Sequence, residues 1–77
     1  MEVDDYMRQQ AKELGFNPSA LTDRQIYVLI EPVFAPENYY NDGEITPDQA
    51  KTIWRKKMKE SGFTLLQIFQ AEKKMNL

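Results

Sequence analysis

The pattern apolar–Thr–x–x–Gln occurs three times in this 77-residue chain and constrains its fold more than any other feature. A Thr at a helix cap accepts a hydrogen bond from a free amide of the first turn, and a Gln three residues later bonds back to the amide of the Thr. Each copy has an apolar residue before the Thr and another after the Gln, which is the spacing of a hydrophobic staple. Three helix starts are therefore predicted, at Thr22, Thr46 and Thr64.

Helical spacing and stop signals extend this prediction to an all-α fold. The four expected helices cover residues 3–14, 22–31, 47–60 and 64–75. Short connections favour antiparallel neighbours, so we expect a small four-helix bundle forming a single domain, residues 1–77. Gly15 and Gly62 are natural helix ends. Pro32 has no amide hydrogen to donate, so the second helix is expected to end or kink before it.

The apolar residues that repeat at helical spacing are assigned to the core. They are Val3, Tyr6, Met7, Ala11 and Leu14, then residues 26–30, then Ala50, Ile53, Trp54 and Met58, and finally Leu65, Ile68, Phe69 and Met75. Lys57 falls within the apolar arc of the third helix. We expect its stem to run along the edge of the core while its amine stays in water.

Residues 32–45 are predicted to form one long central loop, because they are rich in turn-forming residues. A connection of this length is unusual in so small a domain and is often functional. Phe34, Tyr39 and Tyr40 lie in it, and aromatic side chains are common anchors of protein interfaces. These three residues are the candidate partner-binding site, and the alternative is that they fill the core beneath the loop.

The composition argues against several classes of function. The chain has no Cys and no His, which excludes disulfides and thiolate metal sites and removes the commonest general base and zinc ligand. We therefore predict no catalytic residue, no cofactor and no metal site, and we do not expect an enzyme. An acidic start without an apolar run is unlike a signal peptide, and no segment approaches the roughly 20 apolar residues of a membrane span. A cytoplasmic protein without a membrane partner is expected.

The net charge of −2 conceals an asymmetry between the two parts of the chain. Residues 1–50 hold three basic and ten acidic groups, whereas residues 51–77 hold seven basic and two acidic groups. The two parts either pair with each other in the folded domain or present a charged surface to a partner. The basic groups suggest nucleic-acid binding as an alternative function. The residues for that alternative are Lys51, Arg55, Lys56, Lys59, Lys73 and Lys74.

Residues 14–56 resemble an EF-hand region of the calmodulin type. The segment Leu14-Gly15-Phe16-Asn17-Pro18-Ser19 resembles the linker between two hands, and Asp42-Gly43-Glu44-Ile45-Thr46 resembles the middle of a calcium loop. In that alignment Tyr40 takes the third ligand position and Gln49 the last, where a working loop has a polar ligand and a bidentate Glu. The resemblance implies a degenerate hand that keeps the helix–loop–helix shape without the metal.

Taken together, these features predict a non-enzymatic module that binds another protein, as an adaptor, an inhibitor or an assembly factor.

Overall fold

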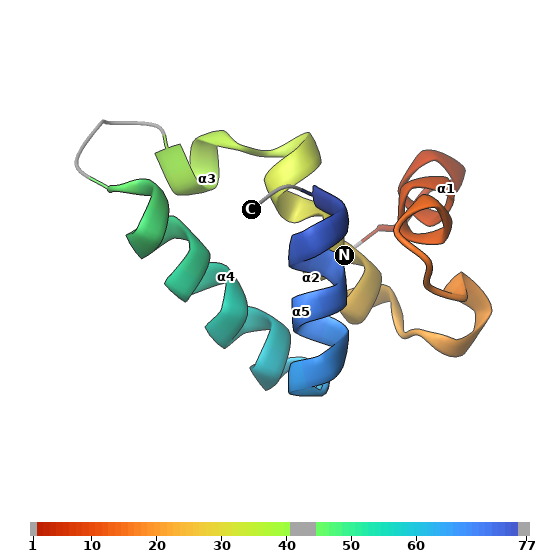
Figure 1. Cartoon of the computed structure of the whole chain (residues 1–77). Helices are drawn as coiled ribbons and strands as arrows, with labels where there is room; N and C mark the ends of the chain where they lie inside the picture. The colour runs from red at the N-terminus through yellow and green to blue at the C-terminus, as the bar shows by residue number, and fades with distance from the viewer. Residues whose placement is uncertain (1, 41–44, 76–77) are drawn as a thin grey trace.

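The computed structural model of the chain describes residues 2–40 and 45–75, and these form helices joined by short turns. The elements are α1 (Asp5–Glu13), the 3-10 turn η1 (Pro18–Ala20), α2 (Asp23–Phe34), α3 (Glu37–Tyr40), α4 (Pro47–Glu60) and α5 (Leu65–Met75). The helix α2 contacts α1, α3 and α4, and α5 packs on α4 (Figure 1). The described residues contain no strand, so the predicted all-α fold is confirmed. None of the described helices combines the length and the apolar character needed to cross a bilayer.

All three predicted Thr boxes form with both of their hydrogen bonds. At the first box the amide of Gln25 donates to the Thr22 hydroxyl at 3.1 Å, and the Thr22 amide donates to the Gln25 side chain at 2.9 Å. The same reciprocal bonds at Thr46 and Thr64 measure between 2.8 and 3.2 Å. The starts of α2, α4 and α5 therefore lie at the predicted positions, because each is decided by contacts within four residues.

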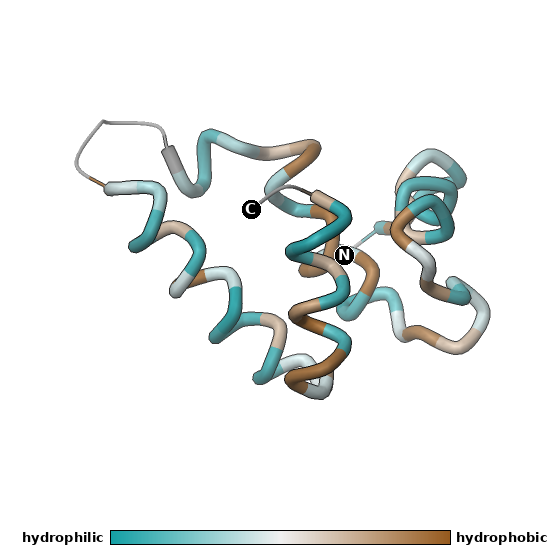
Figure 2. The backbone as a smooth tube through the Cα atoms, viewed as in Figure 1, coloured by the Kyte–Doolittle hydropathy of each residue, from teal (hydrophilic) through white to brown (hydrophobic). Residues whose placement is uncertain are grey.

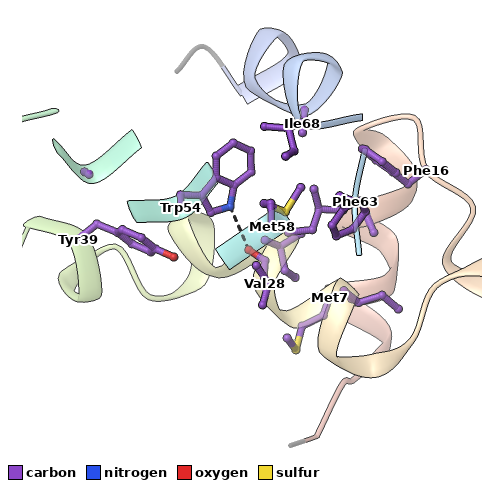
Figure 3. Packing of buried hydrophobic residues seen from close by; sticks show 14 residues of the cluster. Met7, Phe16, Val28, Tyr39, Trp54, Met58, Phe63 and Ile68 are labelled. Atoms are coloured by element: carbon purple, nitrogen blue, oxygen red, sulfur yellow. Dashed lines mark hydrogen bonds between the residues drawn. The ribbon is translucent and has the colours of Figure 1, made fainter. Parts of the chain in front are cut away.

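Two glycine turns end α1 and α4 in the same way. Gly15 has a φ of 91° and Gly62 a φ of 104°, a left-handed conformation that a side chain would strain. The residue after each glycine donates its amide to the carbonyl five residues earlier, at 3.1 Å, as in a Schellman motif. Those following residues are Phe16 and Phe63, whose rings meet edge to face at 5.7 Å (Figure 3). The two turns are thus joined in the core.

The predicted end of the second helix at residue 31 is wrong, because α2 continues through Pro32 to Phe34. In a regular helix the amide of residue 32 would donate to the carbonyl of Val28, and proline cannot do so. The indole N–H of Trp54, on α4, donates to that carbonyl instead, at 3.0 Å (Figure 3). Because this bond is buried, it removes much of the cost of a proline inside the helix.

The predicted central loop is shorter than expected. The last turn of α2 and the short helix α3 occupy most of the described part of residues 32–45.

The core lies between α1, α2 and α4 and is closed on one side by α5. Its largest fully buried side chains are Trp54, Tyr39, Ile26, Leu29, Ile30, Met58 and Ile68. The core assignment of four residues is wrong, because their side chains are exposed: Tyr6 (57%), Ile53 (37%), Leu65 (55%) and Phe69 (52%).

The indole of Trp54 donates to the Val28 carbonyl in place of the missing amide at Pro32, and a double-mutant experiment tests this substitution of one donor for another. Trp54→Phe removes the indole N–H and leaves the Val28 carbonyl without a donor, which costs about 1–3 kcal/mol in addition to lost packing. Pro32→Ala restores a backbone amide at the position that faces this carbonyl. We expect Pro32→Ala to be more favourable in the Trp54→Phe background than in the wild type, by about 1 kcal/mol. Urea unfolding followed by far-UV circular dichroism measures the four free energies.

Met58→Leu provides the matched control, because it alters a fully buried residue of the same helix and leaves the indole intact. Pro32→Ala and Met58→Leu should add within about 0.5 kcal/mol. Equally additive behaviour of Pro32→Ala with Trp54→Phe would contradict the role assigned to the indole.

Candidate protein-binding face

The aromatic residues predicted as partner anchors do not form an exposed cluster. Tyr39 is only 1% exposed and belongs to the core (Figure 3). Phe34 is half-buried, and its ring meets that of Tyr27 edge to face at 5.0 Å. Tyr40 ends α3, and its side chain lies outside the described part of the structure. For Tyr39 the alternative interpretation, a residue that fills the core beneath the connection, agrees with the structure.

Tyr39 is held inside by a buried polar network centred on Glu31, a residue of α2 that is 6% exposed. The Tyr39 hydroxyl donates to the Glu31 carboxylate at 2.5 Å, and the side-chain amide of Asn38 donates to its other oxygen at 3.1 Å. The amine of Lys57, on α4, donates to the same carboxylate at 3.1 Å and lies 4.9 Å from the centre of the Tyr39 ring. Three donors from two helices thus converge on one buried charge.

These hydrogen bonds decide the protonation state of Glu31. Burial by itself raises the pKa of this carboxyl group, because it disfavours the charged form. The hydrogen bonds from Tyr39, Lys57 and Asn38 together outweigh burial, so the pKa of Glu31 lies below its ordinary value of 4.5. Glu31 is therefore an ionised, fully engaged structural group at neutral pH rather than a proton donor.

The position of Lys57 differs from the sequence-based expectation. Its side chain is 40% exposed, and its amine pairs with the buried carboxylate of Glu31, a partner that the sequence did not indicate. This ion pair joins the acidic first part of the chain to the basic second part. The other two ion pairs of the described residues, Arg8–Asp23 and Arg55–Glu72, each lie within one part. Among the described residues, Lys57–Glu31 is thus the one ion pair that links the two parts of the chain.

An exposed apolar surface is found on α5 and not on the central connection. Leu65, Leu66 and Phe69 are 55%, 78% and 52% exposed, and we call these three residues the α5 face. In Figure 2 the beginning of α5 is brown, the colour of hydrophobic residues. The opposite side of the helix is buried through Ile68 and Ala71. A helix that buries one stripe and exposes a second apolar stripe has a surface that water solvates poorly.

The pair Arg55–Glu72 explains why Phe69 faces outward. Glu72 is 7% exposed and accepts two hydrogen bonds from the guanidinium of Arg55, so a carboxylate occupies a buried position of α5. The hydrogen bonding to Glu72, together with the charge of this carboxylate, raises the pKa of Arg55. The same guanidinium lies 5.8 Å from the centre of the Phe69 ring. Arg55 therefore covers one edge of this ring and borders the α5 face.

The six basic residues predicted as a nucleic-acid site are distributed over α4 and α5. Arg55 is engaged with Glu72, and Lys51 is half-buried. The other four, Lys56, Lys59, Lys73 and Lys74, are exposed. Lys73 follows Phe69 by four residues, and Lys59 follows Arg55 by four, so both lie on the side of their helix that borders the α5 face.

A hollow of about 550 Å³ lies at the start of α4, and two of the polar side chains that line it are already engaged within the helix. It is lined by Ile45, Asp48, Gln49, Thr52 and Ile53. The Gln49 side chain accepts the amide of Thr46, and the Thr52 hydroxyl donates to the carbonyl of Asp48 at 3.0 Å. A ligand site needs several convergent polar groups that are free to orient a ligand, and Gln49 and Thr52 are already used within the first turns of α4.

The residues of the EF-hand resemblance are only partly described. Asp42 and Gly43 lie outside the described residues. Asn38, which takes the first ligand position when Tyr40 takes the third, lies in α3 with its side-chain amide bonded to Glu31. Gln49, assigned to the last, is used to cap α4. Over residues 2–40 and 45–75, no group of three or more acidic side chains lies close enough to hold a metal ion.

Comparison of the chain with protein-family models, with curated proteins and with solved structures finds no match. Arguments about function therefore rest on the residues themselves.

Sequence periodicity alone could not find the α5 face. Leu65 and Phe69 fit an inward stripe with Ile68, and a charged residue such as Glu72 is normally assigned to the surface. The pairing of Glu72 with Arg55 rotates the buried side of α5 toward Ala71. The consecutive apolar pair Leu65-Leu66 was the available signal, because adjacent helical residues point about 100° apart and a helix buried along one narrow stripe leaves one of them outside it.

The network around Glu31 leads to a prediction of pH dependence. A carboxyl group whose pKa is lowered by folding stabilises the fold above its unfolded pKa, and this contribution is lost as pH falls through the folded pKa. Glu31→Gln should lower the free energy of unfolding by about 1–3 kcal/mol at pH 7. Relative to wild type, this deficit should shrink below about pH 4.5 as the wild-type carboxylate is protonated. Urea unfolding at several pH values from 7 to 3 measures it.

Glu13→Gln, at an exposed position of α1, is the matched control and should change the stability at pH 7 by less than about 0.5 kcal/mol. A deficit for Glu31→Gln that stays constant from pH 7 to pH 3 would contradict an ionised Glu31 in the folded protein.

Proposed function

We propose that this chain is a non-enzymatic protein-binding module and that the α5 face is its contact surface. The observation that carries the proposal is the joint exposure of Leu65, Leu66 and Phe69 within five residues. Six large apolar side chains are exposed in the described part of the chain, and half of them belong to this one face. Large apolar side chains gathered on one helix face are typical of surfaces that bind another protein.

The chemistry of the remaining side chains favours binding over catalysis. The sequence contains no His and no Cys, so the commonest general base and the thiolate nucleophile are missing. The one buried carboxylate with a shifted pKa, that of Glu31, accepts three hydrogen bonds and stabilises the contact between α2, α3 and α4. A perturbed carboxyl group in such an arrangement is a structural group.

A test of the proposal uses affinity capture from an extract of the cells that produce the protein. We expect the wild-type chain to retain at least one protein that the variant Leu66→Ser/Phe69→Ser does not retain. Each exposed side chain that becomes buried on binding contributes about 1.5–3 kcal/mol, so losing both should weaken capture more than tenfold. Quantitative mass spectrometry of the retained proteins measures the difference.

Tyr6→Ser is the matched control, because Tyr6 is a large side chain that is 57% exposed on α1, away from the α5 face. It should retain the same proteins as the wild type. Circular dichroism confirms that each variant is folded. Identical capture by the wild type and by the double variant would overturn the use of the α5 face.

The exposed lysines support one alternative function, nucleic-acid binding by α4 and α5. For this function we expect a mobility shift of duplex DNA or RNA at low salt that weakens steeply as salt increases. Lys56→Glu/Lys59→Glu should abolish the shift, whereas Leu66→Ser should leave it unchanged, because phosphate contacts do not use an apolar side chain. Absence of a shift at about 50 mM salt would exclude this alternative.

A further inference from the structure

The exposed charged side chains along α5 and the guanidinium of Arg55 beside Phe69 are all cationic. Arg55 lies beside the Phe69 ring, and Lys73 lies one helical turn beyond Phe69. The only acidic residue of α5 within the described chain is Glu72, which is buried and bound to Arg55. A partner that approaches the α5 face therefore meets apolar side chains bordered by cations, without an exposed carboxylate on the same helix.

The shape of the α5 face favours one of the known modes in which a protein binds a peptide segment of its partner. Strand addition requires a free sheet edge, and the described residues form no sheet. Leu65 and Phe69 are separated by four residues, so they form a row along the axis of α5 with Leu66 beside it. A helical segment matches such a row with apolar residues at positions i, i+3, i+4 and i+7.

We propose that the partner of the α5 face is an acidic amphipathic helix, an inference that rests on the proposed function. Its apolar side would cover Leu65, Leu66 and Phe69, and carboxylates at its margin would face Lys73, Lys59 and the exposed part of Arg55. A basic helix would be repelled by these cations. A nucleic acid would pair with the cations but leave the three apolar side chains in water, so a protein segment accounts for both properties of the surface.

Selection from a random peptide display library tests the chemistry of the partner directly. The probe is a library of 16-residue peptides, offered to the immobilised wild-type chain after depletion on the Leu66→Ser/Phe69→Ser variant. We expect the enriched peptides to combine apolar residues at helical spacing with a net charge of about −3 or lower. Depletion removes peptides that bind elsewhere on the chain, so the enriched set reports on the α5 face.

A charge-reversal pair tests the same inference on one enriched peptide. Lys73→Glu should raise its dissociation constant about fivefold, because one favourable charge contact at the rim becomes unfavourable. Lys12→Glu is the matched control, because Lys12 also lies in the last turn of a helix, α1, and is exposed. It should leave the constant within about twofold. Fluorescence anisotropy of the labelled peptide measures both constants.

The outcomes separate the partner class from the binding function. Acidic apolar peptides that weaken with Lys73→Glu support the inference. Enriched peptides that are neutral or basic, or that bind Lys73→Glu as well as wild type, overturn the acidic partner while leaving the α5 face a protein-binding surface. No enrichment beyond the depleted background, together with identical capture of cell proteins by the wild type and by the Leu66→Ser/Phe69→Ser variant, overturns the proposed function itself.

Discussion

The hydrogen bond from the Trp54 indole to the carbonyl of Val28 is the contact on which the centre of the fold depends. Proline at position 32 leaves that carbonyl without its helical donor, and a buried carbonyl without a donor is costly. Because α4 supplies the donor, α2 retains helical geometry for most of another turn, to Phe34. The same bond fixes α4 against α2 at a defined depth and rotation. The Trp54 side chain thus both supplies the hydrogen bond that Pro32 cannot make and packs α4 against α2.

The polar network forms because α2 does not stop early. Glu31 immediately precedes the proline, and its carboxylate is directed to the space between α3 and α4, where Tyr39, Asn38 and Lys57 reach it. Other placements of α3 are unfavourable, because they would leave the Glu31 carboxylate buried without the hydrogen bonds from Tyr39 and Asn38. The hydrogen bond from Trp54 to Val28 and the polar network around Glu31 therefore both hold α4 in the same position against α2.

Local features were predictable from the sequence, and features that depend on distant residues were not. The Thr boxes and glycine turns are decided within a few residues, so their positions agree with the structure. The passage of α2 through Pro32 depends on Trp54, whose partner Val28 is 26 residues away in the chain. The outward position of Phe69 likewise depends on the pairing of Glu72 with Arg55 across two helices. Neither interaction leaves a periodic signal.

The edge-to-face contact between Phe16 and Phe63 has a consequence for how the chain can be divided. The sequence Lys-Glu-x-Gly-Phe occurs at both turns, so each half contributes a similar helix, glycine turn and ring. Both rings are buried and in contact with each other, so separation of the halves would expose part of each ring to water. Neither half is then a cooperative folding unit. Fragments that end between the two turns should behave as weakly helical peptides rather than as smaller domains.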